Sequence, residues 1–431
     1  MIRQSSVIAQ ALRLLVRAAI FLIPVLALAA DRHVGVASCA SSLCHGSTKP
    51  LEAHAVLQNE YVSWSQFDPH SEAYRVLLNA RSREIARRMG IGKPEQAPAC
   101  LACHAEVVPP AERGPRFQAS DGIGCESCHG AAERWLPTHH QSPRVTHADN
   151  LLRGLIALER PEVRAEKCSA CHVGDRDRFA THRMMAAGHP RLVFELDTYT
   201  ELWRTSGGRE HYRRDTDYRS RKGVPASSAV WTTGLVIATR QQLALIGQHA
   251  VRGRGPFPDF ALYACHSCHR DLKLDAWGAA TGGKTGELRL QDGHARTLRV
   301  IGLALELPAA QSFGQALDRL QSAANGDGES LPQALASVQS ALETLGAGLA
   351  TRNWNAADRT RALDALVAAT RRGEFADPAT AEQAAMGMVV LLADLELDRN
   401  RRKEIDALFA ALRDDNAFNA ARFARALERL R

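Results

Sequence analysis

The ten cysteines of this 431-residue chain form five pairs, and a histidine directly follows the second cysteine of every pair. Four pairs have the spacing Cys-x-x-Cys-His, and the first pair is longer, with four residues between its cysteines. The cysteines are Cys39 and Cys44, Cys100 and Cys103, Cys125 and Cys128, Cys168 and Cys171, and Cys265 and Cys268; the histidines are His45, His104, His129, His172 and His269. Covalent attachment of haem c requires this pattern, because two thiols bond the porphyrin edge while the next imidazole binds iron.

Zinc binding and disulfide formation are the alternatives, since paired Cys-x-x-Cys segments also occur in zinc ribbons. Histidine makes up 17 of the 431 residues, so five motif positions would all hold histidine by chance roughly once in ten million sequences. We therefore predict five covalently bound haem c groups. At the longer motif, attachment through Cys44 alone, with Cys39 a free thiol, is the alternative.

The first thirty residues predict export. Arg3, Arg13 and Arg17 precede an apolar run over 18–30, which ends in small residues just before Asp31. We interpret residues 1–30 as a secretory signal peptide and expect a periplasmic protein, because haem is joined to cysteine on the far side of the inner membrane. An uncleaved N-terminal membrane anchor is the competing interpretation. No later segment has eighteen uninterrupted apolar residues.

The net charge does not indicate nucleic-acid binding. The formal charge of +7 falls to +4 without the three leader arginines, with 51 basic against 47 acidic side chains. Haem propionates bring the loaded protein close to neutrality. Only the segment 203–222 is locally basic, and we interpret it as a solvated loop; the alternatives are pairing with propionates and docking of an acidic redox partner.

The chain divides into two parts by composition. Every cysteine and every histidine lies before residue 295, so we predict a pentahaem domain over 31–294 and a helical domain over 295–431. The second part shows helical periodicity, for example at Leu335, Val338, Leu342 and Leu345. Asp377-Pro378 is typical of a helix start. We predict a mostly α fold with little regular strand, in which the haem domain precedes a C-terminal bundle of four to six helices.

Twelve histidines lie outside the motifs and could supply second axial ligands: His33, His54, His70, His139, His140, His147, His182, His189, His211, His249, His266 and His294. His266 is the weakest candidate, because it lies within an attachment motif. His211 lies in the arginine-rich segment, and His249 lies on an apolar helix where a core histidine is an equal interpretation.

Three segments carry a family resemblance. They are Trp64 to Leu77 with Asp68-Pro69-His70, the motif from Cys100 to His104, and Gly122-Ile123-Gly124-Cys125-Glu126-Ser127-Cys128-His129-Gly130. They resemble the cytochrome c-554 family of multihaem cytochromes, whose relatives include the haem arrangements of hydroxylamine oxidoreductase and pentahaem nitrite reductase. The similarity covers about residues 34–189. The stretched first motif, the fifth motif and the long helical tail depart from the tetrahaem namesake.

The resemblance implies that His70, and His139 or His140, supply distal imidazoles, and that His182 and His189 do so for later haems. His54, His147 and His294 compete for any remaining position. In the family the haem of the second motif can lack a sixth ligand, which here would be the haem on His104.

Two function classes follow. We expect a periplasmic electron carrier between unidentified redox proteins, without catalytic side chains, because closely packed haems exchange electrons unaided. The alternative is an oxidoreductase acting on a small nitrogen or sulfur compound at a five-coordinate haem. All five motifs end in histidine, whereas pentahaem nitrite reductases have lysine at the active haem. The helical tail could also dock on a membrane electron-transport complex.

Overall fold

A computed structural model describes residues 30–52, 56–205, 210–251, 259–269, 287–427 and 430. The predicted signal peptide, 1–30, lies outside these ranges apart from Ala30. Within them the chain forms helices and loops, and the only strand-like pairings are isolated bridges of His33 with Arg113 and Tyr263 with Leu290. The prediction of a mostly α fold is confirmed. None of the described helices combines the length and apolarity needed to cross a membrane.

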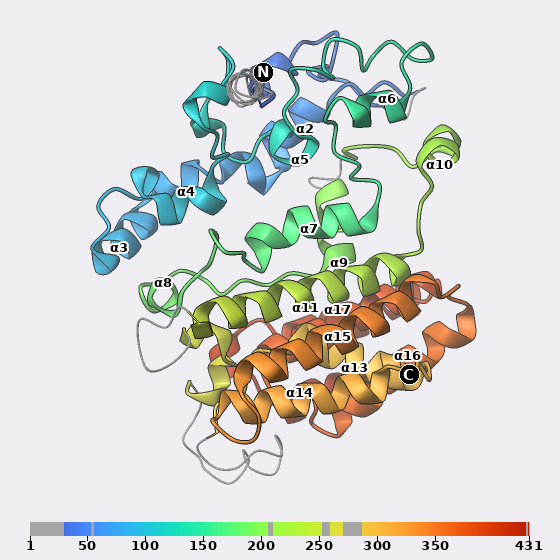
Figure 1. The fold of residues 1–431 in the computed structure, drawn as a ribbon. Helices are drawn as coiled ribbons and strands as arrows, with labels where there is room; N and C mark the ends of the chain where they lie inside the picture. Colours follow the sequence, from blue (N-terminus) through green and yellow to red (C-terminus); the bar gives the residue numbers. More distant parts are fainter. Residues whose placement is uncertain are drawn as a thin grey trace, which may run out of the picture.

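The first half contains short helices separated by long loops (Figure 1). The α-helices are α2 (Glu60–Phe67), α3 (Ala80–Met89), α4 (Pro98–His104), α5 (Cys125–His129), α6 (His147–Leu152), α7 (Pro161–His172), α8 (His182–Ala186), α9 (Leu196–Arg204) and α10 (Thr216–Lys222). Four haem motifs and most of the free histidines lie in this half, so haem contacts would replace much of the side-chain core that such a loop-rich segment otherwise needs.

The second half is a packed helical bundle, coloured yellow-green to red in Figure 1. Its members are α11 (Ser227–Val251), α13 (Gly293–Ala304), α14 (Ala310–Ala324), α15 (Leu331–Ala350), α16 (Ala356–Arg371), α17 (Pro378–Asp394), α18 (Arg402–Ala410) and α19 (Ala420–Leu427). Seven of these α-helices lie in the described part of the predicted tail, whereas the sequence predicted four to six. The number is higher because the last stretch folds as the two short helices α18 and α19.

Helix α11 joins the two halves. It packs against α7 and α9 toward the haem motifs and against α13, α15 and α17 within the bundle (Figure 1). The predicted boundary at residue 294 falls inside α13, and α11, which precedes that boundary, shares the bundle core. The division into 31–294 and 295–431 stays a prediction.

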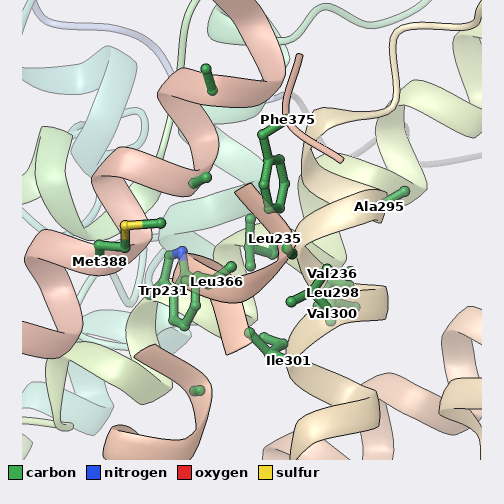
Figure 2. Packing of buried hydrophobic residues seen from close by; sticks show 14 of the residues in the cluster. Trp231, Leu235, Val236, Ala295, Leu298, Val300, Ile301, Leu366, Phe375 and Met388 are labelled. Carbon is green, nitrogen blue, oxygen red and sulfur yellow. The ribbon is translucent and has the colours of Figure 1, made fainter. Parts of the chain in front are cut away.

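Large apolar side chains fill the bundle core. Trp231, Phe313, Phe375 and Phe423 are fully buried, and Figure 2 shows Trp231 of α11 beside Met388 and Leu366. Helix α17 approaches α11 at Gly387, where an added Cβ would lie 2.4 Å from the indole ring of Trp231. A glycine is therefore required at this crossing, because any larger side chain would push the helices apart.

Local sequence signals in the bundle match the structure. The predicted stripe of Leu335, Val338, Leu342 and Leu345 is buried on α15. Asp377 caps α17, accepting a hydrogen bond from the backbone N–H of Thr380, and Pro378 occupies the first helical position. Both predictions are confirmed, and both depend on periodicity and capping chemistry that act within a few residues.

Candidate haem-binding site

The regular motifs lie on helical turns. The motif helices α4 and α7 end at His104 and His172, α5 consists of the motif Cys125–His129, and Cys265–Ser267 forms a 3-10 turn. On such a turn the residues at positions i and i+3 share a face, so the two thiols of one motif project together. All ten cysteines are free thiols. The regular motifs therefore have the local geometry for two thioether bonds to one porphyrin.

The stretched motif keeps the backbone relation of the regular ones. In the motif at Cys265, the N–H of His269 donates to the carbonyl of Cys265, at 2.8 Å. In the stretched motif the N–H of His45 donates to the carbonyl of Cys39, at 3.3 Å, although two more residues intervene. A turn closed by Ser41 contains those residues, since its carbonyl accepts from Cys44 and Gly46. The histidine thus stands in the same position relative to the first cysteine.

Four motif histidines face a histidine from elsewhere in the chain. An imidazole nitrogen binds iron at about 2 Å and lies about 1.1 Å from its ring centre, so two trans axial imidazoles have centres roughly 6 Å apart. The pairs and their ring-centre separations are His45 with His139 (6.2 Å), His172 with His70 (6.0 Å), His104 with His189 (6.3 Å) and His269 with His182 (6.2 Å). Each separation fits one iron between the rings.

Hydrogen bonds at Nδ1 orient five of these eight rings. Backbone carbonyls of Ala73, Leu136 and Pro190 lie 2.7–2.8 Å from Nδ1 of His104, His139 and His189. The carboxylates of Glu60 and Asp68 lie 2.8 Å from Nδ1 of His45 and His70. A bond at Nδ1 fixes the tautomer and leaves Nε2 for the metal, the usual arrangement of a histidine ligand.

The two carboxylate partners are well enclosed. Asp68 has only 7% of its side chain exposed and also accepts a hydrogen bond from the indole N–H of Trp203, at 2.6 Å. Although burial opposes the effect, the contact with His70 lowers the pKa of Asp68, and the contact with His45 lowers that of Glu60. Both groups are therefore anionic at neutral pH, and each makes the imidazole it touches a stronger electron donor to iron.

Replacing Glu60 with glutamine should raise the midpoint potential of the haem on His45. Glutamine keeps the oxygen that accepts from the backbone N–H of Leu57 but loses the negative charge that favours ferric iron. We expect a shift on the order of tens of millivolts, since about 59 mV corresponds to a tenfold change in the equilibrium constant of a one-electron reduction. Redox titration followed by electron paramagnetic resonance measures it. Glu52→Gln, at an exposed carboxylate paired with Arg213, is the control, and equal potentials in both variants would refute the role of Glu60.

Cysteines of different motifs lie side by side. The thiol of Cys39 contacts that of Cys125, and the thiol of Cys103 contacts that of Cys171. The thiol of Cys128 also lies within electrostatic range of that of Cys168. These contacts connect the first motif to the third, the third to the fourth, and the fourth to the second. Groups attached to these cysteines would be close neighbours, as electron exchange requires.

The fifth motif histidine, His129, has a different environment. Among the described histidines, none has its ring within the separation of about 6 Å that the four pairs show. Burial, followed by the charges of nearby His211 and Lys222, lowers the pKa of His129 to about 3. The ring centre of His211 lies 4.5 Å from that of Trp203, and the backbone N–H of His211 donates to the carbonyl of Arg204. Among the histidines, His211 has the largest electrostatic effect on His129.

The remaining histidines have other partners. Nε2 of His147 bonds to Glu159, that of His266 to the carbonyl of Asp415, and that of His294 to the carbonyl of Phe194. His249 packs on Phe179, His33 bonds to Glu106, and His140 lies beside His139. His54 lies outside the described residues.

The structure therefore brings each of the predicted distal histidines, His70, His139, His182 and His189, opposite a motif histidine. It also departs from the expectation of an open position at His104, because His189 lies opposite that ring. His211, whose arginine-rich surroundings suggested a solvated loop, packs against Trp203 in the structure. The neighbouring aromatic residues Trp203 and Tyr212 were the available signal that this segment packs inward.

Comparison with known proteins finds one family match. The sequence model of the cytochrome c554 and c-prime family matches residues 38–130, a span that contains the first three motifs, His70 and the buried Asp68. The chain is a c-type cytochrome that resembles the cytochrome c554 family. The match covers about a fifth of the sequence, and no curated protein and no solved structure matches the chain.

As a c-type cytochrome, the protein binds haem covalently and functions in electron transfer. The residues present fit that group, since the paired thiols, the adjacent histidines and the facing imidazoles supply both attachment and axial ligation. Bound haem supplies a one-electron couple between ferric and ferrous iron. The chain itself holds the imidazoles, fixes their tautomers and surrounds them with helices.

Proposed function

We propose that this cytochrome carries five haem c groups and transfers electrons in the periplasm between redox proteins. The attachment residues are the ten motif cysteines. The axial ligands are the pairs His45 and His139, His104 and His189, His172 and His70, and His269 and His182, together with His129, for which His211 is the second ligand. The four ring separations of 6.0–6.3 Å carry this proposal.

Closed coordination favours a carrier. When both axial positions hold histidine, iron changes its charge without gaining or losing a ligand, so little structural rearrangement opposes electron exchange. The cysteine contacts that connect four motifs support a continuous route among the haems. The exposed thiols of Cys44 and Cys265 lie at opposite ends of the motif series, and redox partners would exchange electrons near them. Residues 31–294 would form the haem domain, and the helices after it a scaffold or a docking module for a membrane complex.

Haem stoichiometry tests the proposal directly. Protein exported to a periplasm should have the mass of the cleaved chain plus five haems, and reductive titration should take up five electrons per chain. Attachment at the stretched motif follows from its preserved bond between His45 and Cys39. Four haems with the peptide of Cys39 and Cys44 unmodified would refute that site. Five haems with Cys39 open to alkylation would show that the first haem is attached through Cys44 alone.

An oxidoreductase acting on a small nitrogen or sulfur compound is the competing function. It would need an open iron position and a proton donor, and the nearby Glu106 and His147 are already bonded to His33 and Glu159. Steady turnover of hydroxylamine, nitrite or sulfite with an artificial redox partner would therefore overturn the carrier assignment.

A further inference from the structure

The basic segment around α10 neutralises most of its own charge. Arg204 pairs with Glu201 and Glu210, Arg213 pairs with Glu52, Arg214 pairs with Glu201, and Arg221 pairs with Asp217. Lys222, the last residue of α10, forms no ion pair among the described residues. Its ammonium instead lies over the ring of Tyr218, 5.4 Å from the ring centre. Among the described cations of this segment, Lys222 and Arg219 are left without an ion pair, and the guanidinium of Arg219 donates instead to the backbone carbonyl of Arg214.

A second cation without a carboxylate lies beside the same tyrosine. Arg164, near the start of α7, donates to the carbonyl of Leu158 at 2.8 Å. Its Nε is buried and has no hydrogen-bond partner, and its charge acts on the hydroxyl of Tyr218. A buried N–H of a guanidinium without an acceptor is costly, so an acceptor from outside the described side chains is indicated.

The nearest protein carboxylate does not fill this need. Glu159 lies within electrostatic range of Lys222 but bonds to Nε2 of His147, at 2.7 Å. The same ammonium acts on His129, so Lys222 lies near the motif whose haem we assign to His129, and Arg164 is connected to it through Tyr218. Haem carries two carboxylates of its own, and a pair of cations beside one phenol suits such an anion.

We propose that Lys222, Arg164 and the hydroxyl of Tyr218 form a cradle for a carboxylate, and that a propionate of the haem on His129 occupies it. The inference rests on the proposed attachment of a haem at Cys125 and Cys128. The cradle anchors that haem from α10 and α7 at once. Two cations against one propionate would leave a net positive charge near that haem, which would favour its ferrous state.

Lys222→Met tests the cradle, because methionine keeps the length of the side chain and removes its charge. The midpoint potential of one haem should fall, and it should be the haem whose paramagnetic resonance signal changes in His211→Ala. Lys222→Arg should keep the potential near that of the wild type. The matched control is Arg221→Met, which removes the adjacent charge but from an exposed pair with Asp217. Equal potentials in Lys222→Met and Arg221→Met would overturn the inference.

Two further measurements separate the sources of failure. An intact mass lacking the haem at Cys125 and Cys128 would refute the proposed function at this motif rather than the cradle. Added inorganic phosphate should leave the potentials of the wild type unchanged, because the propionate already fills the site. A shift of one potential by phosphate, abolished in Lys222→Met, would show that the cradle takes a free oxyanion and would overturn the assignment to haem.

Discussion

Replacing His189 with alanine should convert one low-spin haem to high spin and create a binding site for small ligands. His189 lies opposite His104 with a ring separation of 6.3 Å, and alanine cannot bind iron. In the wild type, cyanide must compete with a tethered imidazole. If the unligated form is populated at about 1% or less, removing His189 raises the apparent affinity for cyanide about a hundredfold or more.

Spin state and cyanide titration measure this effect together. The midpoint potential of the same haem should also rise, because ferric iron loses a strong donor imidazole. His140→Ala is the matched control, since His140 lies beside the axial candidate His139 but faces no motif histidine. A high-spin haem already present in the wild type, and unaltered in His189→Ala, would show that His104 has an open position, as the family resemblance implied.

The sequence could predict those features of the site that residues close together in the chain determine. It could not predict those that depend on contacts between distant segments. The motif cysteines and histidines are adjacent in sequence, so their geometry follows from one helical turn. Pairing His104 with His189 requires the loop after α8 to reach α3, where the guanidinium of Arg81 donates to the carbonyl of Gly188. No local pattern encodes that contact. The position of His211 was not predictable for a similar reason. Its ring packs on Trp203, whose indole N–H donates to Asp68, 135 residues earlier in the chain.

The same holds for the helices of the bundle, some of which could be predicted from nearby residues and some of which could not. Helices α15 and α17 were predictable because their apolar stripe and their cap act within a few residues. The place of α11 was not, because its apolar residues occur around the whole helix and indicate no single buried face. It packs against both α7 and α15, so composition alone could not assign it to one half of the chain.

Replacing Trp231 with alanine should destabilise the bundle by about 3–5 kcal/mol, the usual cost of truncating a buried aromatic side chain. Trp231 is fully buried where α11 crosses α17. Its indole N–H has no hydrogen-bond partner, so Trp231→Phe loses less, because it removes an unsatisfied donor along with part of the volume. Urea unfolding followed by circular dichroism measures the free energies. Leu303→Ala, at a half-exposed position on α13, should change the stability by only about 0.5 kcal/mol.

A double-mutant cycle with Gly387 locates the effect at the helix crossing. An alanine Cβ at that position would lie 2.4 Å from the indole of Trp231, so Gly387→Ala alone should cost about 1–3 kcal/mol by overpacking. In the Trp231→Ala background the space is free, and the same substitution should cost nothing or stabilise the helix, because alanine favours helix over glycine by about 1 kcal/mol. Additive effects would place the two residues out of contact. Since α11 also supports α7, which ends in the motif histidine His172, the destabilised variants should lose order around that haem before the others.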